Sequence, residues 1–166
     1  MSEAGKPNSG EAGKPSSGEV GKPTSGEAEK QTTGETLALG HAFPDHRCGV
    51  VGAARVSAYA TASGDDNPIH TDEATARSIG LDGTIIQGML LMALADEALA
   101  AWRPDSVCRR LTARFARPAP TGSEVVIGGR VVKTEAVAGA ELATLRIMVR
   151  DGKGAVLAMA EAVIEN

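Results

Sequence analysis

The stretch that decides the expected fold runs from Ile85 to Ala101 and reads IIQGMLLMALADEALAA. Apolar side chains occupy nearly every position until two carboxylates, Asp96 and Glu97, interrupt the run. A helix that is apolar on every side is buried, whereas a surface helix has an apolar stripe and a polar face. We therefore expect a core helix whose first half is buried all round and whose end is exposed.

The sequence that follows this helix changes to a period of two after Pro104. Runs of β type lie at residues 111–115, 125–132, 142–149 and 155–164. Turn-forming residues separate them at 118–122 and at 151–154, and the second group, DGKG, is a strong hairpin signal. One buried helix followed by antiparallel strands predicts an α+β fold in which the sheet curls around the helix.

Two shorter helices are expected before the core helix. The first covers residues 53–62, and the second covers residues 72–79 and stops at Gly80. His41 and His46 lie in a loop-like stretch further upstream, and we expect both to be solvated.

The N-terminal end of the chain has a different composition. Residues 3–34 repeat with a period of eight, as EAGKPNSG, EAGKPSSG, EVGKPTSG and the degraded EAEKQTTG. Apart from Val20 the repeat has no aliphatic side chain larger than alanine, so nothing offsets the entropy of ordering it. We predict a disordered tail at 1–34, which acts as a solubilising spacer or alternatively as a docking segment, and one domain at 35–166.

The overall composition of the 166 residues excludes several classes of function. The formal net charge of −4 gives no general attraction to nucleic acid or to an anionic membrane. The longest apolar run, residues 89–95, is far shorter than the roughly 20 residues of a membrane helix. Cys48 and Cys108 match no metal-ligand spacing and are expected to be reduced, buried thiols. These features predict a soluble, cytoplasmic protein.

The polar loop SGDDNPIH at residues 63–70 is the candidate site. On a regular helix Asp65 and His70 would lie roughly 140° apart, so they converge only if the chain bends. Pro68 supplies a bend, because it fixes its own φ and pushes Asn67 toward an extended conformation. The alternative is an ordinary turn, with Thr71 capping the next helix.

The order of these motifs resembles a known family. YATASGDDNPIHTDEATARSIGLDGTIIQGML at residues 59–90, followed by ARFARPAPTG at residues 113–122, closely resembles the MaoC-like (R)-specific enoyl-CoA hydratases. The resemblance covers essentially residues 36–166. It implies the hot-dog fold, an antiparallel sheet wrapped around a long central helix.

The resemblance also implies roles for individual residues. Asp65 and His70 match the family's catalytic acid and histidine, Asn67 its orienting amide, and Gly88 the glycine whose backbone N–H faces the thioester oxygen. Hydration needs a base for water, an acid for C2 and a donor for the enolate-like oxygen.

Two positions depart from the family pattern, which commonly has His where this chain has Gln87 and Ser where it has Ala93. We expect Gln87 to contact the substrate together with Asn67 and Arg114. The competing interpretation of Gln87 is a capping box with Thr84, which would start the helix earlier and occupy the N–H that follows. A helix start near Gln87 leaves that N–H free, and we favour it.

The resemblance implies reversible hydration of trans-2-enoyl-CoA to (R)-3-hydroxyacyl-CoA, a lyase reaction of fatty acid metabolism. The alternatives are a non-catalytic or weakly active acyl-CoA-binding module and an acyl-CoA thioesterase. The partners implied are an acyl-CoA or acyl-carrier thioester and a second copy, as a homodimer or dimer of dimers, with no metal and no cofactor. Arg109, Arg110 and Arg114 either attract the CoA phosphates or form an ordinary soluble strand edge.

Overall fold

The computed structural model describes residues 36–137 and 139–165. The octapeptide repeat, and with it the expected disorder of residues 1–34, lies outside the described residues. The elements follow in the order β1 (Ala42–Val51), α1 (Ala53–Ser63), a 3₁₀ turn (Pro68–His70), α2 (Glu73–Ser78), α3 (Gly88–Trp102), β2 (Val107–Phe115), β3 (Ser123–Val137), β4 (Ala140–Asp151) and β5 (Val156–Glu165).

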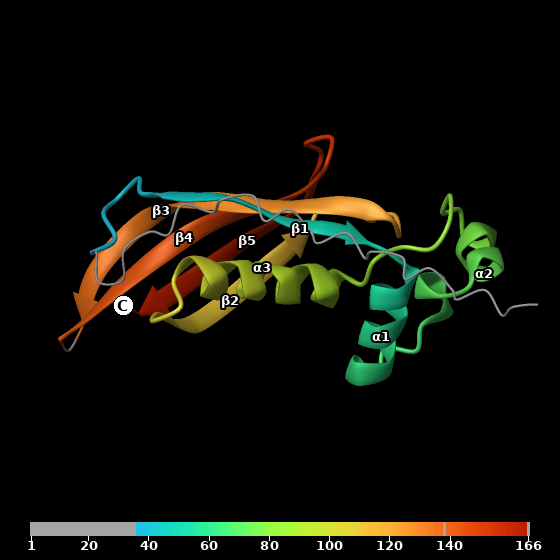
Figure 1. Cartoon of the computed structure of the whole chain (residues 1–166), viewed down its shortest axis with the longest axis horizontal. Coiled ribbons are helices and arrows are strands. Elements are labelled where there is room, and N and C mark those ends of the chain that lie inside the picture. The colour runs from blue at the N-terminus through green and yellow to red at the C-terminus, as the bar shows by residue number, and fades with distance from the viewer. Residues whose placement is uncertain (1–35, 138, 166) are drawn as a thin grey trace, which may run out of the picture.

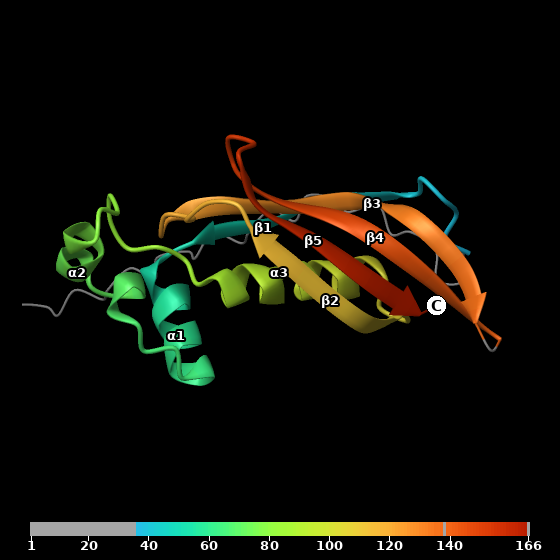
Figure 2. The ribbon, with the colours of Figure 1, turned by 180° about the vertical axis from the view of Figure 1, so that it is seen from behind.

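The strands form one antiparallel sheet that curves over α3. Their order is β1-β3-β4-β5-β2, so β1 and β2 are the two edges. In Figure 1 α3 lies in front of the sheet, and from behind, in Figure 2, β2 and β5 cross in front of α3. The predicted α+β arrangement, a sheet wrapped around a central helix, is confirmed.

The core lies between α3 and the inner face of the sheet. The buried side of α3 contributes Leu90, Leu91, Leu94, Ala95, Ala98 and Leu99. The strands contribute residues at alternate positions, among them Val125, Ile127, Leu145, Ile147 and Val149. Burying each leucine, isoleucine or valine fully contributes about 1.5–3 kcal/mol, so this layer is the main source of stability.

The expectation that the first half of α3 is buried on every side is wrong. Met89 is 55% exposed, and Ala93 lies on the same open side. The reason is geometric: the sheet curls around one side of the helix, and none of the described elements covers the other side. An apolar face of α3 therefore remains uncovered beside the edge strand β2.

The stretch around His41 and His46 is also different from the expectation, because residues 42–51 form the edge strand β1. The pairing of β1 with β3 is interrupted twice, between Phe43 and His46 and between Arg47 and Gly49. Both histidines are half-buried, and the ring of His41 lies 6.0 Å from that of Trp102. Neither is a fully solvated loop residue.

The two predicted turns have different roles. DGKG closes the β4–β5 hairpin, where the Asp151 carboxylate accepts the backbone N–H groups of Lys153 and Ala155 and Gly154 has φ 87°. Residues 116–122 instead carry the chain from β2 across two strands to β3. This crossing passes the start of α3, where the N–H of Ile86 donates to the carbonyl of Ala119 at 2.8 Å.

Candidate active site

The polar loop begins where α1 ends. Gly64 takes the left-handed conformation, with φ 73°, and its N–H bonds to the carbonyl of Ala60, which terminates the helix. Three side-chain-to-backbone bonds of the i, i+2 type follow: Ser63 Oγ accepts from Asp65 N at 3.3 Å, Asp65 Oδ1 from Asn67 N at 3.4 Å, and Asn67 Oδ1 from Ile69 N at 3.3 Å. Short polar side chains therefore fold this loop locally.

Pro68 bends the loop as the sequence predicts. Asn67 is extended, with ψ 118°, and Pro68 opens the 3₁₀ turn that ends at His70. Asp72, and not Thr71, caps α2, because its carboxylate accepts the N–H of Thr75 at 2.6 Å. Hydrogen bonds from the backbone and the side chain of Thr75 hold the pKa of Asp72 below its usual value.

The bend brings Asp65 and His70 together. His70 Nε2 lies 3.6 Å from Asp65 Oδ2, an ion-pair distance slightly beyond a direct hydrogen bond. On the other side of the ring, Nδ1 lies 2.8 Å from the carbonyl oxygen of Ile85. A carbonyl only accepts, so Nδ1 carries a proton, and in the neutral ring the Nε2 lone pair faces Asp65.

Ile85 fixes this geometry from both sides. Its N–H donates to the carbonyl of Ile69 at 3.3 Å, while its own carbonyl receives His70 Nδ1. It also bridges to Pro120 in the crossing segment. His70 is only 8% exposed, so the imidazole has one orientation set by backbone groups.

A largely apolar cavity of about 390 Å³ lies beside His70. The other lining residues come from the start of α3, the end of β2 and the crossing segment: Ile85, Ile86, Gly88, Leu91, Phe115, Ala116, Arg117, Pro118 and Ala119. A cavity with few polar groups suits an apolar ligand. Asp65 faces His70 without lining this cavity.

Gly88 opens α3 next to the cavity. It is the first residue of the helix, a position whose N–H has no intrahelical acceptor and which carries the positive end of the helix dipole. A Cβ at this position would lie 2.9 Å from Phe115 Cζ, so glycine is what allows the ring to pack here. The preferred helix start near Gln87 is confirmed, and the capping box with Thr84 is wrong.

The side chain of Gln87 turns away from the cavity. Gln87 is 1% exposed, and its Nε2 donates to the backbone carbonyl of Val56 in α1 at 3.0 Å. The amide of Asn67 is likewise engaged locally, with the backbone of Ile69. Contact between the substrate and the side chain of Gln87 or Asn67 stays a prediction. The hydrogen bonds that both amides make to the backbone do not favour it.

The arginines of the β2 region separate into two groups. Arg109 is paired with Glu165 at 2.7 Å and Arg110 with Glu161 at 3.2 Å, so their charges are compensated locally. Arg114 is exposed on β2 opposite Met159, on the other face from Ala113, which packs against the core. Arg117, two residues beyond the strand, is the arginine that lines the cavity.

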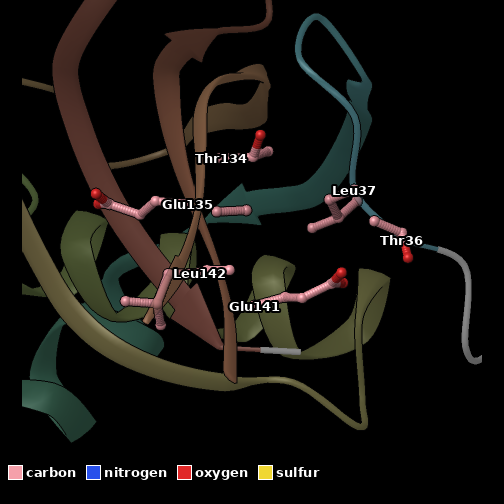
Figure 3. Close-up of a pocket in the computed structure, with 8 residues that line it drawn as sticks. Thr36, Leu37, Thr134, Glu135, Glu141 and Leu142 are labelled. Carbon is pink, nitrogen blue, oxygen red and sulfur yellow. The ribbon is translucent and has the colours of Figure 1, made fainter. Parts of the chain in front are cut away.

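A second hollow of about 250 Å³ lies at the far end of the β3–β4 hairpin (Figure 3). Thr36, Leu37, Thr134, Glu135, Glu141 and Leu142 are among the residues that line it. Glu135 is paired with Lys133 at 2.8 Å, and no histidine or cysteine is present in this lining. The chemistry-bearing groups of the loop lie at the other end of the sheet, so the cavity beside His70 is the candidate active site.

The two thiols lie away from this cavity. Both are half-buried against the core and form no disulfide, so the expectation of buried thiols is met only in part. Burial and the nearby Glu97 carboxylate raise the pKa of Cys48 to about 11, and Arg55 offsets part of this increase. Burial and Asp96 also raise the pKa of Cys108. Low nucleophilicity follows for both at neutral pH.

Residues 36–137 and 139–165 contain neither a metal-binding cluster nor a membrane-spanning helix. Three or more histidine, cysteine or acidic side chains do not gather there in an arrangement that could hold a metal ion. Within the same ranges, no helix has the length and apolar character needed to cross a membrane.

The sequence predicts Asp65, His70 and Gly88 as site residues; the structure brings Asp65 to His70 and places His70 and Gly88 in one cavity lining, and their catalytic roles stay a prediction. The sequence does not predict a role in the site for the Ile85 carbonyl, Phe115 or Arg117. Only Arg117 and Phe115 carried a signal, since both fall inside the ARFARPAPTG motif beside the residue that was chosen, Arg114.

The sequence matches the model of a family described as the MaoC like domain over residues 16–150. The match begins inside the repeat, outside the described residues. The (R)-specific enoyl-CoA hydratase of Aeromonas caviae is 33% identical over 116 residues, which is 69% of this chain and 85% of that protein.

Two further likenesses point in the same direction. A mitochondrial 3-hydroxyacyl-[acyl-carrier-protein] dehydratase of Arabidopsis thaliana is 31% identical over 71 residues, and the match spans 43% of each chain, less than half of that relative. The solved structure of an (R)-hydratase from A. caviae involved in PHA biosynthesis superposes with a TM-score of 0.70 at 29% identity, covering 78% of this chain and 97% of that chain.

Proposed function

The chain belongs to the MaoC-like domain family, with the hot-dog fold, and we propose that it hydrates trans-2-enoyl thioesters to (R)-3-hydroxyacyl thioesters, or catalyses the reverse dehydration. The family likeness supports hydratase or dehydratase chemistry in general, and the direction, the stereochemistry and the substrate belong to the proposal. The observation that carries it is the His70–Asp65 contact at 3.6 Å, with the other ring nitrogen held by the Ile85 carbonyl, beside an apolar cavity that Gly88 also lines.

The proposed reaction begins with His70 as the base. Nε2 takes a proton from water while the water oxygen bonds to C3 of the enoyl thioester. The C2–C3 π electrons move toward the carbonyl, and the negative charge that develops on the thioester oxygen is stabilised by the Gly88 N–H at the positive end of α3. One such donor is worth about 10²–10³ in rate.

The second proton transfer completes the addition. Asp65, facing Nε2, receives the proton held by His70 and delivers it to C2, so the sum of the steps is one water added across the double bond. The exchanged assignment, with Asp65 as the base and His70 as the acid, is the alternative, because the two atoms face each other. A positioned acid and base contribute about 10²–10⁴ in rate.

The cavity also supports an acyl thioester as substrate. Its apolar lining suits the acyl chain, and Arg117 offers a cation to an anionic phosphate of CoA or of a carrier's prosthetic arm. No cofactor enters this scheme, because every proton and electron pair is supplied by water, the thioester and the two side chains.

A homodimer is part of the proposal. β2 is an edge strand, Phe115 on it is 46% exposed, and Met89 on the open side of α3 is 55% exposed. Apolar groups beside an unpaired strand edge are covered most simply by a second copy of the chain. The expected cytoplasmic location stays a prediction.

Binding without turnover is the second candidate function. Two observations favour it. The distance of 3.6 Å between His70 Nε2 and Asp65 Oδ2 is longer than a hydrogen bond, and Asp65 does not line the cavity. Thioesterase action is less favoured: the carboxylates of α3, Asp96 and Glu97, lie exposed in its second half, and Glu97 is paired with Arg55 at 2.9 Å.

One assay separates the three functions. Crotonyl-CoA is incubated with the purified protein while loss of the conjugated double bond and release of free thiol are followed together. Hydratase action removes the double bond without releasing thiol, and thioesterase action releases thiol. Saturable binding with neither change would identify a binding module and contradict the proposal.

A further inference from the structure

Gln87 makes a buried contact that the proposed reaction does not use. Its backbone caps α3 and directly precedes Gly88, but its side chain forms no cap bond. Instead Nε2 donates at 3.0 Å to the carbonyl of Val56, a residue 31 positions earlier in the chain. The contact is fully enclosed, since Gln87 is 1% exposed and Val56 is 0% exposed.

This hydrogen bond joins the two parts of the candidate site. Val56 lies in α1, and the chain leaves α1 at Ser63 and reaches Asp65 two residues later. Gln87 itself is bonded through its peptide group to Gly88. One side chain therefore ties the helix that delivers the carboxylate to the backbone that presents the N–H donor.

The other polar atom of the Gln87 amide has a different environment. Gln87 Oε1 is buried and has no hydrogen-bond partner among the described residues. An unsatisfied buried acceptor is unfavourable, and an apolar side chain of similar size would avoid it. Among the described residues, the amide is therefore used through its Nε2 donor toward Val56 and not through Oε1.

We propose that Gln87 is a positioning residue, which sets the Asp65–His70 loop relative to the Gly88 N–H by bonding the Val56 carbonyl. The inference rests on the proposed function, and it differs from a substrate-binding role because the amide does not line the cavity. A misplacement of about 1 Å at a reacting centre can cost about 10²-fold in rate.

The first test replaces Gln87 with methionine, a side chain of nearly the same size. Gln87→Met removes the donor, and we expect kcat with crotonyl-CoA to fall roughly 10- to 100-fold with KM changed less than about twofold, because the contact acts on geometry and not on substrate binding. Ile147→Val removes one methyl group from a buried side chain of β4 that does not line the cavity, so it is the control for loss of stability and should leave kcat unchanged.

Gln87→Glu adds a pH readout that a structural role would not give. An ionised carboxylate faces the Val56 carbonyl without a proton, whereas a protonated carboxyl donates to it. Burial favours the protonated form of the introduced group. The ratio of kcat for Gln87→Glu to kcat for the wild type should therefore rise as pH falls, while the ratio for Gln87→Met stays flat.

Amide hydrogen exchange separates failure of this inference from failure of the proposed function. Gln87→Met should speed exchange at residues 60–70 relative to the β3–β4 ladder, whether or not the protein turns over crotonyl-CoA. Faster exchange in a protein without hydratase activity would retain the coupling and reject the function. Wild-type kcat in Gln87→Met, a kcat for Gln87→Glu that stays as low as that of Gln87→Met at every pH, or unchanged exchange at residues 60–70 would each overturn the positioning role.

Discussion

Replacing Gly88 with alanine is the smallest change that should disable the site. The new Cβ would lie 2.9, 3.0 and 3.1 Å from three ring carbons of Phe115. Carbon atoms prefer separations of about 3.5–4.0 Å, so the ring or the start of α3 must move by roughly 0.5–1 Å.

The protein should remain folded after this change. Phe115 is 46% exposed and can yield, and alanine is a better helix former than glycine by about 1 kcal/mol at most. We expect the free energy of unfolding in urea to change by less than about 1 kcal/mol. We expect kcat for crotonyl-CoA hydration to fall roughly 10- to 100-fold, because the displacement occurs at the N–H donor and in the cavity lining.

Two variants make this prediction specific. Gly83→Ala is the matched control, because a Cβ there meets its nearest atom, an oxygen of Glu73, at 3.9 Å and Gly83 has no positive φ. Adding Phe115→Leu to Gly88→Ala removes the ring and should restore part of the lost turnover. Wild-type kcat in Gly88→Ala, or an equal loss in Gly83→Ala, would refute the assignment of Gly88.

The remaining predictions concern the catalytic pair, the tail and a thiol. Asp65→Asn and His70→Ala should each lower kcat by about 10²–10⁴ while circular dichroism shows an intact fold, and near-normal turnover in either variant would reject the pair. Deleting residues 1–34 should leave kcat and Tm nearly unchanged, because a segment with so few large apolar side chains buries little area; a large fall in Tm would show that it packs against the domain. Cys48, with its pKa raised to about 11, should resist alkylation at neutral pH. The folded protein holds the thiol proton more tightly than the unfolded chain, so Cys48 should lower stability as pH rises from about 8.5 toward 11, and Cys48→Ser should abolish that part of the alkaline loss.

Elements with strong local signals were predicted well from the sequence. The apolar run of α3, the alternating strands and the DGKG hairpin each carry their own pattern, and the structure has all of them. β1 was missed because Pro44 and Gly49 interrupt its pattern and its ladder with β3 is broken at two places. A one-dimensional pattern also cannot show that the sheet covers only one side of α3, which leaves Met89 exposed.

In the candidate site, too, local features were predictable and long-range contacts were not. The Asp65–His70 approach was predictable because Pro68 and the short polar side chains act within eight residues. Contacts between distant segments were not predictable: the Ile85 carbonyl that anchors His70 lies 15 residues away, and the bond from Gln87 to Val56 spans 31. The sequence predicts Arg114 as a substrate contact, whereas Arg117 lines the cavity, because the sequence does not show where β2 ends and the cavity begins.

The central claim, that the Asp65–His70 pair hydrates an enoyl thioester, is tested most directly by the product formed from crotonyl-CoA in water enriched in ¹⁸O. We expect 3-hydroxybutyryl-CoA of R configuration, carrying one ¹⁸O at C3, with no free thiol released, and almost none of this product from His70→Ala. Unchanged crotonyl-CoA, a product of S configuration, or the same yield from wild type and His70→Ala would contradict it.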